Sequence, residues 1–318
     1  EYMDQDDPDY ISRMFYRYDR KLFRFTTDFQ GKLQGDHLKW LAGFGIMNIK
    51  TGPVDIAALN KKRDDNDQLP DTATLYDKYV DWGIIGEKEK DGGNANFVKL
   101  GLVFDTRDNE ANAMKGMWTE ALVVVSPKFF FNETSFAKLV LIHRQYFTLV
   151  PDRLSFVYRL GYQGSIGGQA PFYFQPYMLS SFSTVTKTDG LGGAKNLRGI
   201  MRDRVVGDGV AYGNFELRWK FLKTVIAKQN IYIALNTFAD VGTVVKKVAV
   251  NEEAIRNMEP YPARYFDFGY QNDKLHPSVG AGLRIALNEN FILAVDYGFA
   301  MKKEDGLRGL YINIGNLF

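Results

Sequence analysis

The residue types that most often carry chemistry are few and scattered in this chain. Its three histidines, His37, His143 and His276, lie on separate segments without metal-ligand spacing such as His-x-x-x-His. Neither a Gly-x-Ser-x-Gly elbow nor a phosphate-binding loop is present. A hydrolase would need a serine and a histidine side by side on adjacent segments. His143 and Ser155 lie on neighbouring segments, but the sequence does not decide which face His143 occupies, so this one pair stays open. We therefore expect no enzyme, no metal site and no cofactor.

One arginine has a more specific setting. Arg198 lies near the end of a glycine-rich run, Asp189-Gly-Leu-Gly-Gly-Ala-Lys-Asn-Leu-Arg-Gly-Ile200. Counting alternate positions places Glu216 and Asp240 on the polar faces of neighbouring strands. A loop folded inward would bring Arg198 to both carboxylates, and a guanidinium fits a carboxylate with two parallel hydrogen bonds. Gly199 would let the backbone turn sharply in a crowded interior.

A simpler interpretation of the same residues stays open. Arg198 could be an exposed loop arginine, with Glu216 balanced by Arg218 on its own strand. The order of the segments and the shared polar parity of Glu216 and Asp240 favour the inward loop.

A second polar group, Asp105, Arg107 and Asp108, precedes Gly116. A metal site is one interpretation of these carboxylates. Aspartate and asparagine also favour turns, because they form hydrogen bonds with nearby backbone groups. We favour the turn.

Alternation of apolar and polar residues recurs along most of the chain and predicts β-strands. Near the C-terminus, for example, Leu293, Val295 and Tyr297 alternate with Ala294, Asp296 and Gly298. Segments of this kind lie at 21–34, 37–50, 97–105, 116–126, 136–149, 153–163, 210–221, 229–241, 277–287, 290–301 and 308–318.

The length of these segments indicates a membrane barrel. About ten alternating residues are what a tilted membrane strand needs. The 318 residues include 14% aromatics and no cysteine, and no apolar run approaches the length of a membrane helix. The mean hydropathy of −0.26 is compatible with a barrel, whose membrane signal lies in alternation. We predict an all-β fold, a transmembrane antiparallel up-and-down β-barrel with an inward-folded glycine-rich loop. It has 11–12 strands here and about 16 in the complete protein.

The connections alternate between short and long. Short ones fall at 35–36, 106–115, 150–152, 222–228 and 288–289, and the longest at 51–96, 164–209 and 242–276. Outer-membrane barrels have short periplasmic turns and longer extracellular loops, so we expect the long connections on the outside. Within 51–96, Leu75, Tyr79 and Trp82 follow Thr74 at helical spacing, which predicts a short helix.

The two ends of the chain differ in character. Residues 1–20 begin acidic and lack a signal peptide, so we expect an extracellular loop or the start of an early strand there, with the barrel at 21–318. A closed bacterial barrel has an even number of strands and both ends in the periplasm. The first clear strand would begin outside. We therefore expect that the sequence lacks an N-terminal portion.

Several motifs stand in a fixed order along the chain: Asp105–Asn109 with Gly116, Leu197–Ile200, Phe215–Arg218, Phe238–Gly242 and the final Leu310–Phe318. Together they resemble the BamA/TamA superfamily of bacterial surface antigen barrels. The resemblance implies that Arg198 contacts Glu216 and Asp240. It also implies a C-terminal strand that the assembly machinery recognises, through Tyr311, Ile312, Ile314 and Phe318.

The resemblance implies a function in outer-membrane protein assembly, insertion or translocation in a Gram-negative bacterium. The expected partners are outer-membrane lipid and lipopolysaccharide, together with unfolded outer-membrane protein clients or other subunits of an outer-membrane complex. Two alternatives stay open: a structural or accessory barrel without insertase activity, and a passive pore, which an inward loop disfavours. The net charge of +2 and the pI near 8.5 do not indicate that the protein binds nucleic acid.

Overall fold

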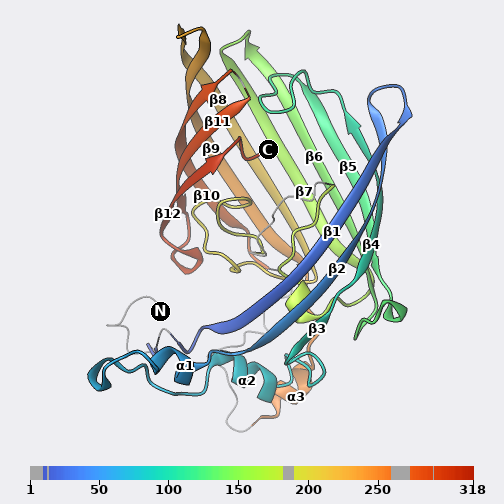
Figure 1. The fold of residues 1–318 in the computed structure, drawn as a ribbon, viewed down its shortest axis with the longest axis vertical. Coiled ribbons are helices and arrows are strands. Elements are labelled where there is room, and N and C mark those ends of the chain that lie inside the picture. Colours follow the sequence, from blue (N-terminus) through green and yellow to red (C-terminus); the bar gives the residue numbers. More distant parts are fainter. Residues whose placement is uncertain (1–9, 13, 182–189, 259–272, 289) are drawn as a thin grey trace.

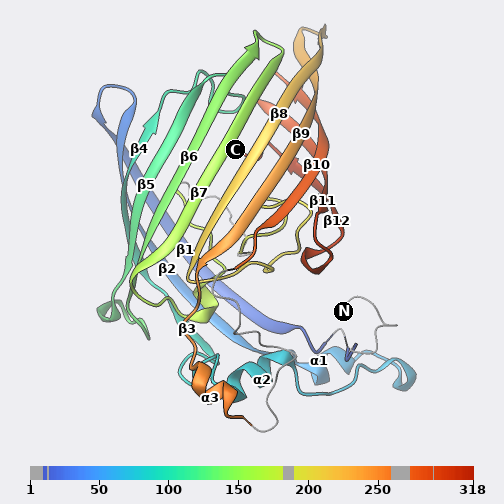
Figure 2. The ribbon, with the colours of Figure 1, turned by 180° about the vertical axis from the view of Figure 1, so that it is seen from behind.

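The computed structural model describes residues 10–12, 14–181, 190–258, 273–288 and 290–318. They form one 12-stranded antiparallel sheet that curves into a barrel wall (Figures 1 and 2). The strands are β1 (Tyr18–Gln34), β2 (Leu38–Pro53), β3 (Gly92–Asn94), β4 (Phe97–Asp105), β5 (Gly116–Ser126), β6 (Phe136–Val150), β7 (Leu154–Gly168), β8 (Gly209–Ile226), β9 (Gln229–Lys246), β10 (His276–Leu287), β11 (Phe291–Ala300) and β12 (Arg308–Ile314).

The predicted antiparallel barrel is confirmed, with three differences. All eleven expected strands are present, each paired with its neighbours in the sequence, and the short β3 pairs with β2 in addition. The last strand was expected to reach Phe318 but ends at Ile314. Within the described residues β1 pairs with β2 and β12 with β11, so a β1–β12 ladder that would close the expected cylinder is not seen.

The two faces of the wall differ as the alternation requires. Side chains such as Phe23, Phe25 and Phe29 point outward and are 64%, 52% and 59% exposed. The intervening positions point into the lumen, where charged residues including Lys99 and Glu120 are buried. Successive side chains of a strand point to opposite faces, so the wall is apolar outside and polar within.

The two ends of the barrel carry different connections. One end, called here the turn end, carries the short links that join β1 to β2, β6 to β7, β8 to β9 and β10 to β11. The other end, called here the loop end, carries the long connections and the helices (Figure 1). The helices are α1 (Ile56–Asn60), α2 (Leu75–Asp81) and α3 (Glu252–Arg256), with 3-10 turns at Asp65–Asp67, Lys128–Phe130, Phe172–Phe174 and Lys303–Asp305. No helix among the described residues is long and apolar enough to cross a membrane.

Helix α2 is the helix expected after Thr74. Its N-terminus carries a capping box, in which the Thr74 side chain accepts from the backbone of Asp77 and the Asp77 side chain accepts from the backbone of Thr74. This pairing satisfies two backbone donors that a helix start otherwise leaves open.

The connection between β7 and β8 folds into the barrel. Its described parts, residues 169–181 and 190–208, are called here the inner loop; residues 182–189 of the expected 164–209 loop lie outside the described residues. Tyr173 and Phe174 pack against the wall beside Phe97, and Leu197 and Ile200 form a second buried cluster. The core of this protein therefore lies in the lumen, between the inner loop and the wall.

Two other expected regions are described only in part. Of residues 1–20, residues 1–9 and 13 lie outside the described part, and β1 begins at Tyr18. Of the long connection 242–276, residues 259–272 lie outside it. The longest connection, 51–96, is described throughout and lies at the loop end (Figure 2).

Candidate functional site

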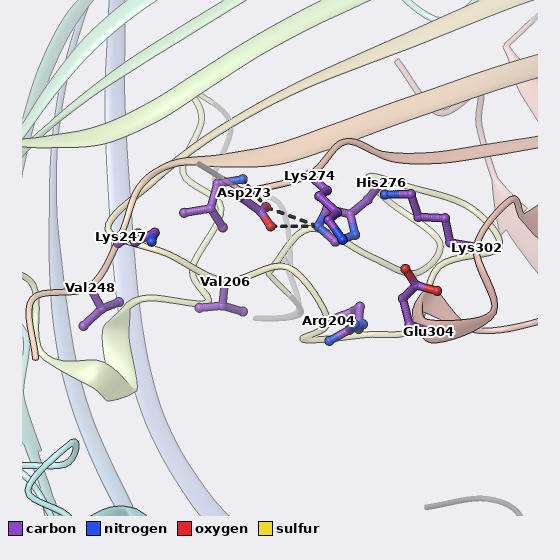
Figure 3. A pocket seen from close by; sticks show the side chains of 10 residues that line it. Arg204, Val206, Lys247, Val248, Asp273, Lys274, His276, Lys302 and Glu304 are labelled. Carbon is purple, nitrogen blue, oxygen red and sulfur yellow. Dashed lines mark hydrogen bonds and ion pairs between the residues drawn. The ribbon is translucent and has the colours of Figure 1, made fainter. Parts of the chain in front are cut away.

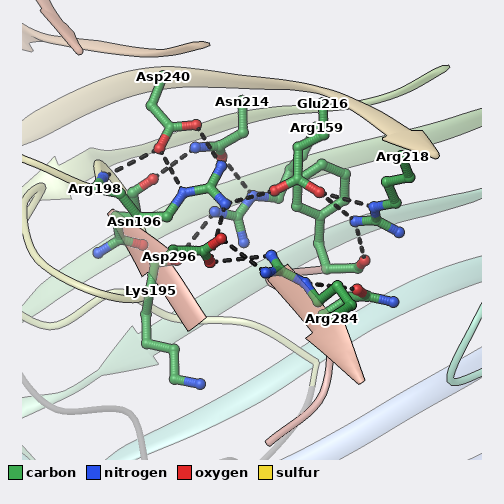
Figure 4. A network of polar contacts seen from close by, with 12 residues as sticks. Arg159, Lys195, Asn196, Arg198, Asn214, Glu216, Arg218, Asp240, Arg284 and Asp296 are labelled. Carbon is green, nitrogen blue, oxygen red and sulfur yellow. Dashed lines mark hydrogen bonds and ion pairs between the residues drawn. The ribbon is translucent and has the colours of Figure 1, made fainter. Parts of the chain in front are cut away.

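Arg198 is fully buried and reaches three carboxylates (Figure 4). Its Nε and one terminal nitrogen donate to the two oxygens of Asp240 at 2.9 and 3.0 Å, and its backbone N–H donates to the same carboxylate at 3.1 Å. The other terminal nitrogen forms ion pairs with Glu216 at 2.7 Å and Asp296 at 3.4 Å. The structure thus places Arg198, Glu216 and Asp240 together and adds Asp296.

Two further arginines complete the charge balance. Arg218 pairs with Glu216 at 2.7 Å, and Arg284 pairs with Asp296 at 2.8 Å. Three arginines therefore face three carboxylates; these six residues, Arg198, Arg218, Arg284, Glu216, Asp240 and Asp296, are called here the arginine network. Buried charges are tolerated only when they are paired and hydrogen-bonded, and each of these charges has a partner.

Burial and charge act in opposite directions on Arg198. Burial alone would lower the pKa of the guanidinium, but the carboxylates of Glu216 and Asp240 outweigh burial and raise that pKa above its usual value. The ring of Phe238 adds a face contact, with the guanidinium carbon 3.5 Å from the ring centroid. Arg198 is therefore held charged and fixed in place.

The loop backbone next to Arg198 lies directly against the wall. Gly199 has a φ of +94°, and a Cβ there would come within 2.7 Å of the Phe299 backbone. The Gly199 N–H donates to the Tyr311 hydroxyl at 2.8 Å. A Cβ on Gly298 would come within 2.8 Å of the Arg198 backbone. Glycine is thus required on both sides of the contact, because either side chain would push the loop away from β11.

A second set of contacts holds the residues just before Arg198. Arg159 on β7 donates to Asn214 at 2.8 Å and to the Lys195 carbonyl at 3.0 Å. Asn214 in turn donates to the Asn196 carbonyl at 2.6 Å. These side chains bind backbone carbonyls of the loop, so they fix the path of the residues that immediately precede Arg198.

A protein-family model that matches most of the chain identifies its family. The Omp85 superfamily domain matches residues 13–318. The chain belongs to the Omp85 superfamily. The expected resemblance to the BamA/TamA barrels is thereby confirmed.

Two solved structures share the Omp85 fold. BamA from Haemophilus ducreyi lacking POTRA domains 1–3 superposes with a TM-score of 0.59 at 14% identity, covering 94% of this chain and 55% of that one. CdiB from Escherichia coli gives a TM-score of 0.53 at 12% identity, covering 94% and 45%. At such identities the likeness concerns the fold, and the chain spans about half the length of these structures. No curated protein sequence matches the chain.

The expected turn group of this Omp85 chain forms a compact link between β4 and β5. Arg107 donates to both oxygens of Asp105, at 2.9 and 3.1 Å, and its guanidinium lies 4.5 Å from the Trp118 ring centroid. Asp108 accepts from the backbone of Met114 at 3.0 Å. At Gly116, where φ is +98°, a Cβ would lie 2.2 Å from a backbone oxygen. These contacts join the turn to the ends of the two strands that it connects.

The expected C-terminal residues do not share one strand. Ile312 and Ile314 point outward from β12, whereas Tyr311 points inward to Gly199. Phe318 lies beyond the strand, inside the lumen (Figure 1). The expectation of a strand ending in Phe318 is wrong, because the extended conformation ends at Gly315, where φ is +87°.

The remaining chemistry-bearing side chains are dispersed. His143 contacts the Thr119 hydroxyl at 2.8 Å on the outward face, and Ser155 is buried on the lumen face. Opposite faces exclude a serine–histidine pair between them. His37 contacts the Asp105 carbonyl at 2.9 Å in the turn region.

His276 lies beside a cavity of about 450 Å³ at the loop end (Figure 3). Its Nδ1 contacts Asp305 at 2.7 Å and its Nε2 contacts Asp273 at 3.1 Å. The other lining residues are Arg204, Val206, Val244, Lys247, Val248, Lys274, Lys302 and Glu304. His276 thus links the start of β10 to the β11–β12 connection.

Sequence reasoning missed Asp296, Arg284 and Arg159. The alternation of 290–301 already put Asp296 on the polar face, and the same parity applied to Arg284 and Arg159. Parity says which face a charge occupies. It does not say which of the many lumen charges meets the loop.

Proposed function

We propose that this chain is the barrel portion of an outer-membrane protein that assembles, inserts or translocates other polypeptides. The observation that carries the proposal is the arginine network, which fixes the inner loop inside an Omp85 barrel. Six buried charges are costly to desolvate, and we infer that they are kept because they hold the inner loop in place.

The proposed mechanism uses the edge of β12. This strand has seven residues, far fewer than β8 or β9, and its ladder in the described residues is to β11 alone. Gly309 weakens it further. Unpaired backbone groups at a strand edge can accept an incoming strand, so we assign β12 as the edge at which a client segment pairs.

The proposed orientation follows from the connections. The loop end faces outward from the cell and the turn end faces the periplasm, because outer-membrane barrels carry their long loops outside. The apolar outer face contacts outer-membrane lipid and lipopolysaccharide. The inner loop occupies the lumen, which disfavours a passive pore, and we assign the protein no catalytic activity.

Depletion of the protein in its own organism tests this function. The steady-state amounts of other outer-membrane barrels should fall, and wild-type protein supplied in trans should restore them. Protein with Arg198→Ala should restore them only in part. If the other barrels keep their normal amounts after depletion, the chain is a structural or accessory subunit instead.

A further inference from the structure

Two arginines lie opposite each other on neighbouring strands of the wall. Arg144 on β6 and Arg159 on β7 are direct partners in the antiparallel register, and they are called here the arginine pair. Register partners point to the same face of a sheet, and Arg159 reaches the inner loop, so both side chains point into the lumen. Like charges in directly opposite positions destabilise two paired strands. The arginine pair therefore needs a compensating interaction.

The arginine pair has no carboxylate partner among the described residues. The Arg144 side chain has no hydrogen bond or ion pair within this part of the chain, and its buried Nε lacks an acceptor. Arg159 donates to two neutral oxygens, those of the Asn214 side chain and the Lys195 backbone, at 2.8 and 3.0 Å (Figure 4). In contrast, all three arginines of the arginine network form ion pairs with carboxylates.

Aromatic rings contact the arginine pair instead of carboxylates. The guanidinium carbon of Arg144 lies 5.7 Å from the Trp118 ring centroid, and that of Arg159 lies 5.2 Å from the Tyr212 ring centroid. A ring face attracts a cation but carries no net charge. Burial and the charge of Arg159 lower the pKa of the nearby Lys195 ammonium below its usual value. The positive potential of the pair thus extends to the inner loop, and an anion is the partner that would balance it.

Arg144 is the member of the pair that a ligand can reach. It is partly exposed, whereas Arg159 is only 6% exposed. Strand β5 begins at the turn end, because it runs antiparallel to β6, which ends there. Arg144 is the register partner of Trp118, two residues after the start of β5. Arg144 therefore lies near the turn end, where a ligand entering the lumen can meet it.

We propose that the arginine pair is a carboxylate-binding site, which binds an acidic side chain of a polypeptide that enters the lumen from the turn end. A guanidinium fits a carboxylate with two parallel hydrogen bonds, and Arg144 supplies these donors. Arg159, opposite Arg144, adds a second positive charge. The inference rests on the proposed function, because a polypeptide client is the source of the carboxylate.

Peptide binding to the purified barrel in detergent tests this site. The probe is a tetramethylrhodamine-labelled peptide, Gly-Ser-Asp-Glu-Asp-Glu-Ser-Gly, followed by fluorescence anisotropy at low salt. A peptide with Asn and Gln in place of Asp and Glu should bind at least about ten-fold more weakly. Arg144→Gln should weaken binding of the acidic peptide about ten-fold, because a hydrogen bond to a charged group contributes about that factor.

Two further variants separate the site from charge in general. Lys223→Gln removes the same charge from an exposed position at the turn end of β8 and should bind the acidic peptide as wild type does. Arg144→Lys keeps the charge without the two parallel donors, so it should restore binding only in part. Arg144→Gln should keep its folded mobility on unboiled gels, because the side chain has no hydrogen bond or ion pair with the described residues.

A second measurement uses the wild-type protein and so does not depend on the folding of a variant. Phenylglyoxal modifies accessible arginines, and mass spectrometry locates the modified residues. The acidic peptide should protect Arg144, whereas Arg153, exposed in the β6–β7 link at the turn end, should stay reactive.

Three results would overturn the proposal. Equal binding of the acidic peptide by Arg144→Gln and wild type would place the peptide elsewhere. Equal affinity for the acidic and amide peptides would show that no carboxylate is recognised. Protection of Arg144 by inorganic phosphate but not by the peptide would make the pair a small-anion site. Any of these results together with a loss of other barrels on depletion would reject the site and leave the proposed function standing.

Discussion

Arg198 is the residue on which the position of the inner loop depends most directly. Arg198→Ala should destabilise the folded barrel by about 3–5 kcal/mol, because three buried carboxylates lose a shared cation. The variant should lose its folded mobility at a lower temperature on unboiled gels, and protease should cut the inner loop faster. Both measurements use the same purified protein.

Two other variants complete this test. Lys195→Ala, three residues away at an exposed position of the same loop, should behave as wild type. Arg198→Lys should rescue only in part, since an ammonium cannot donate two parallel hydrogen bonds to Asp240. Wild-type heat resistance and wild-type protease resistance in Arg198→Ala would remove the arginine network from the mechanism.

Asp208 makes the attachment of the inner loop sensitive to acid. It accepts from Ser165 at 2.5 Å and pairs with Lys246 at 2.9 Å. Burial alone would raise the pKa of Asp208, but these contacts and the charge of Lys138 lower it below its usual value. A group with a lowered folded-state pKa contributes stability above its unfolded pKa and loses it as pH falls through the folded value.

We therefore expect hydrogen exchange in residues 190–208 to accelerate as pH falls below about 4, after correction for the intrinsic pH dependence of exchange. Asp208→Asn should exchange faster at neutral pH and lose most of this dependence. A corrected exchange rate that is equally pH-dependent in the variant would assign the acid response to other carboxylates.

At the scale of the elements, β11 provides a test of which face meets lipid. Leu293 points outward, and Arg at this position should cost about 2–4 kcal/mol if it lies near the bilayer midplane. Folding into lipid vesicles, followed by denaturant titration, measures this free energy.

The same strand supplies the control for depth. Phe291 also points outward but begins the strand at the turn end, where Arg should cost only about 0–1 kcal/mol. Equal costs at Phe291 and Leu293 would contradict the proposed membrane placement of β11, and no cost at either would show that this face contacts water.

At the scale of the whole molecule, the inner loop determines what the lumen can pass. The loop packs against the wall through two buried clusters and the arginine network, so the intact barrel should show low conductance in planar bilayers. Replacing residues 191–206 with a short Gly-Ser linker should raise the single-channel conductance severalfold. High conductance of the unaltered protein would favour the pore.

Much of the fold could be predicted from the sequence, because alternation is a local property. Eleven strands and the faces of Glu216, Asp240 and Leu293 followed from counting alternate positions. The partners of Arg198 were harder to predict from the sequence. Glu216 and Asp240 could be named on the next two strands, but Asp296 lies 98 residues away from Arg198, and parity gave no reason to choose it over other lumen charges.

The sequence by itself determined an antiparallel wall with an apolar outer face and a polar lumen, since side-chain direction along a strand depends only on neighbouring residues. The tertiary structure decided where the inner loop lies, which charges meet at Arg198, and where the last strand stops. Phe318 reaches Arg218 across 100 residues of chain. Such contacts depend on the curvature of the whole sheet, to which every strand contributes, so no local pattern encodes them.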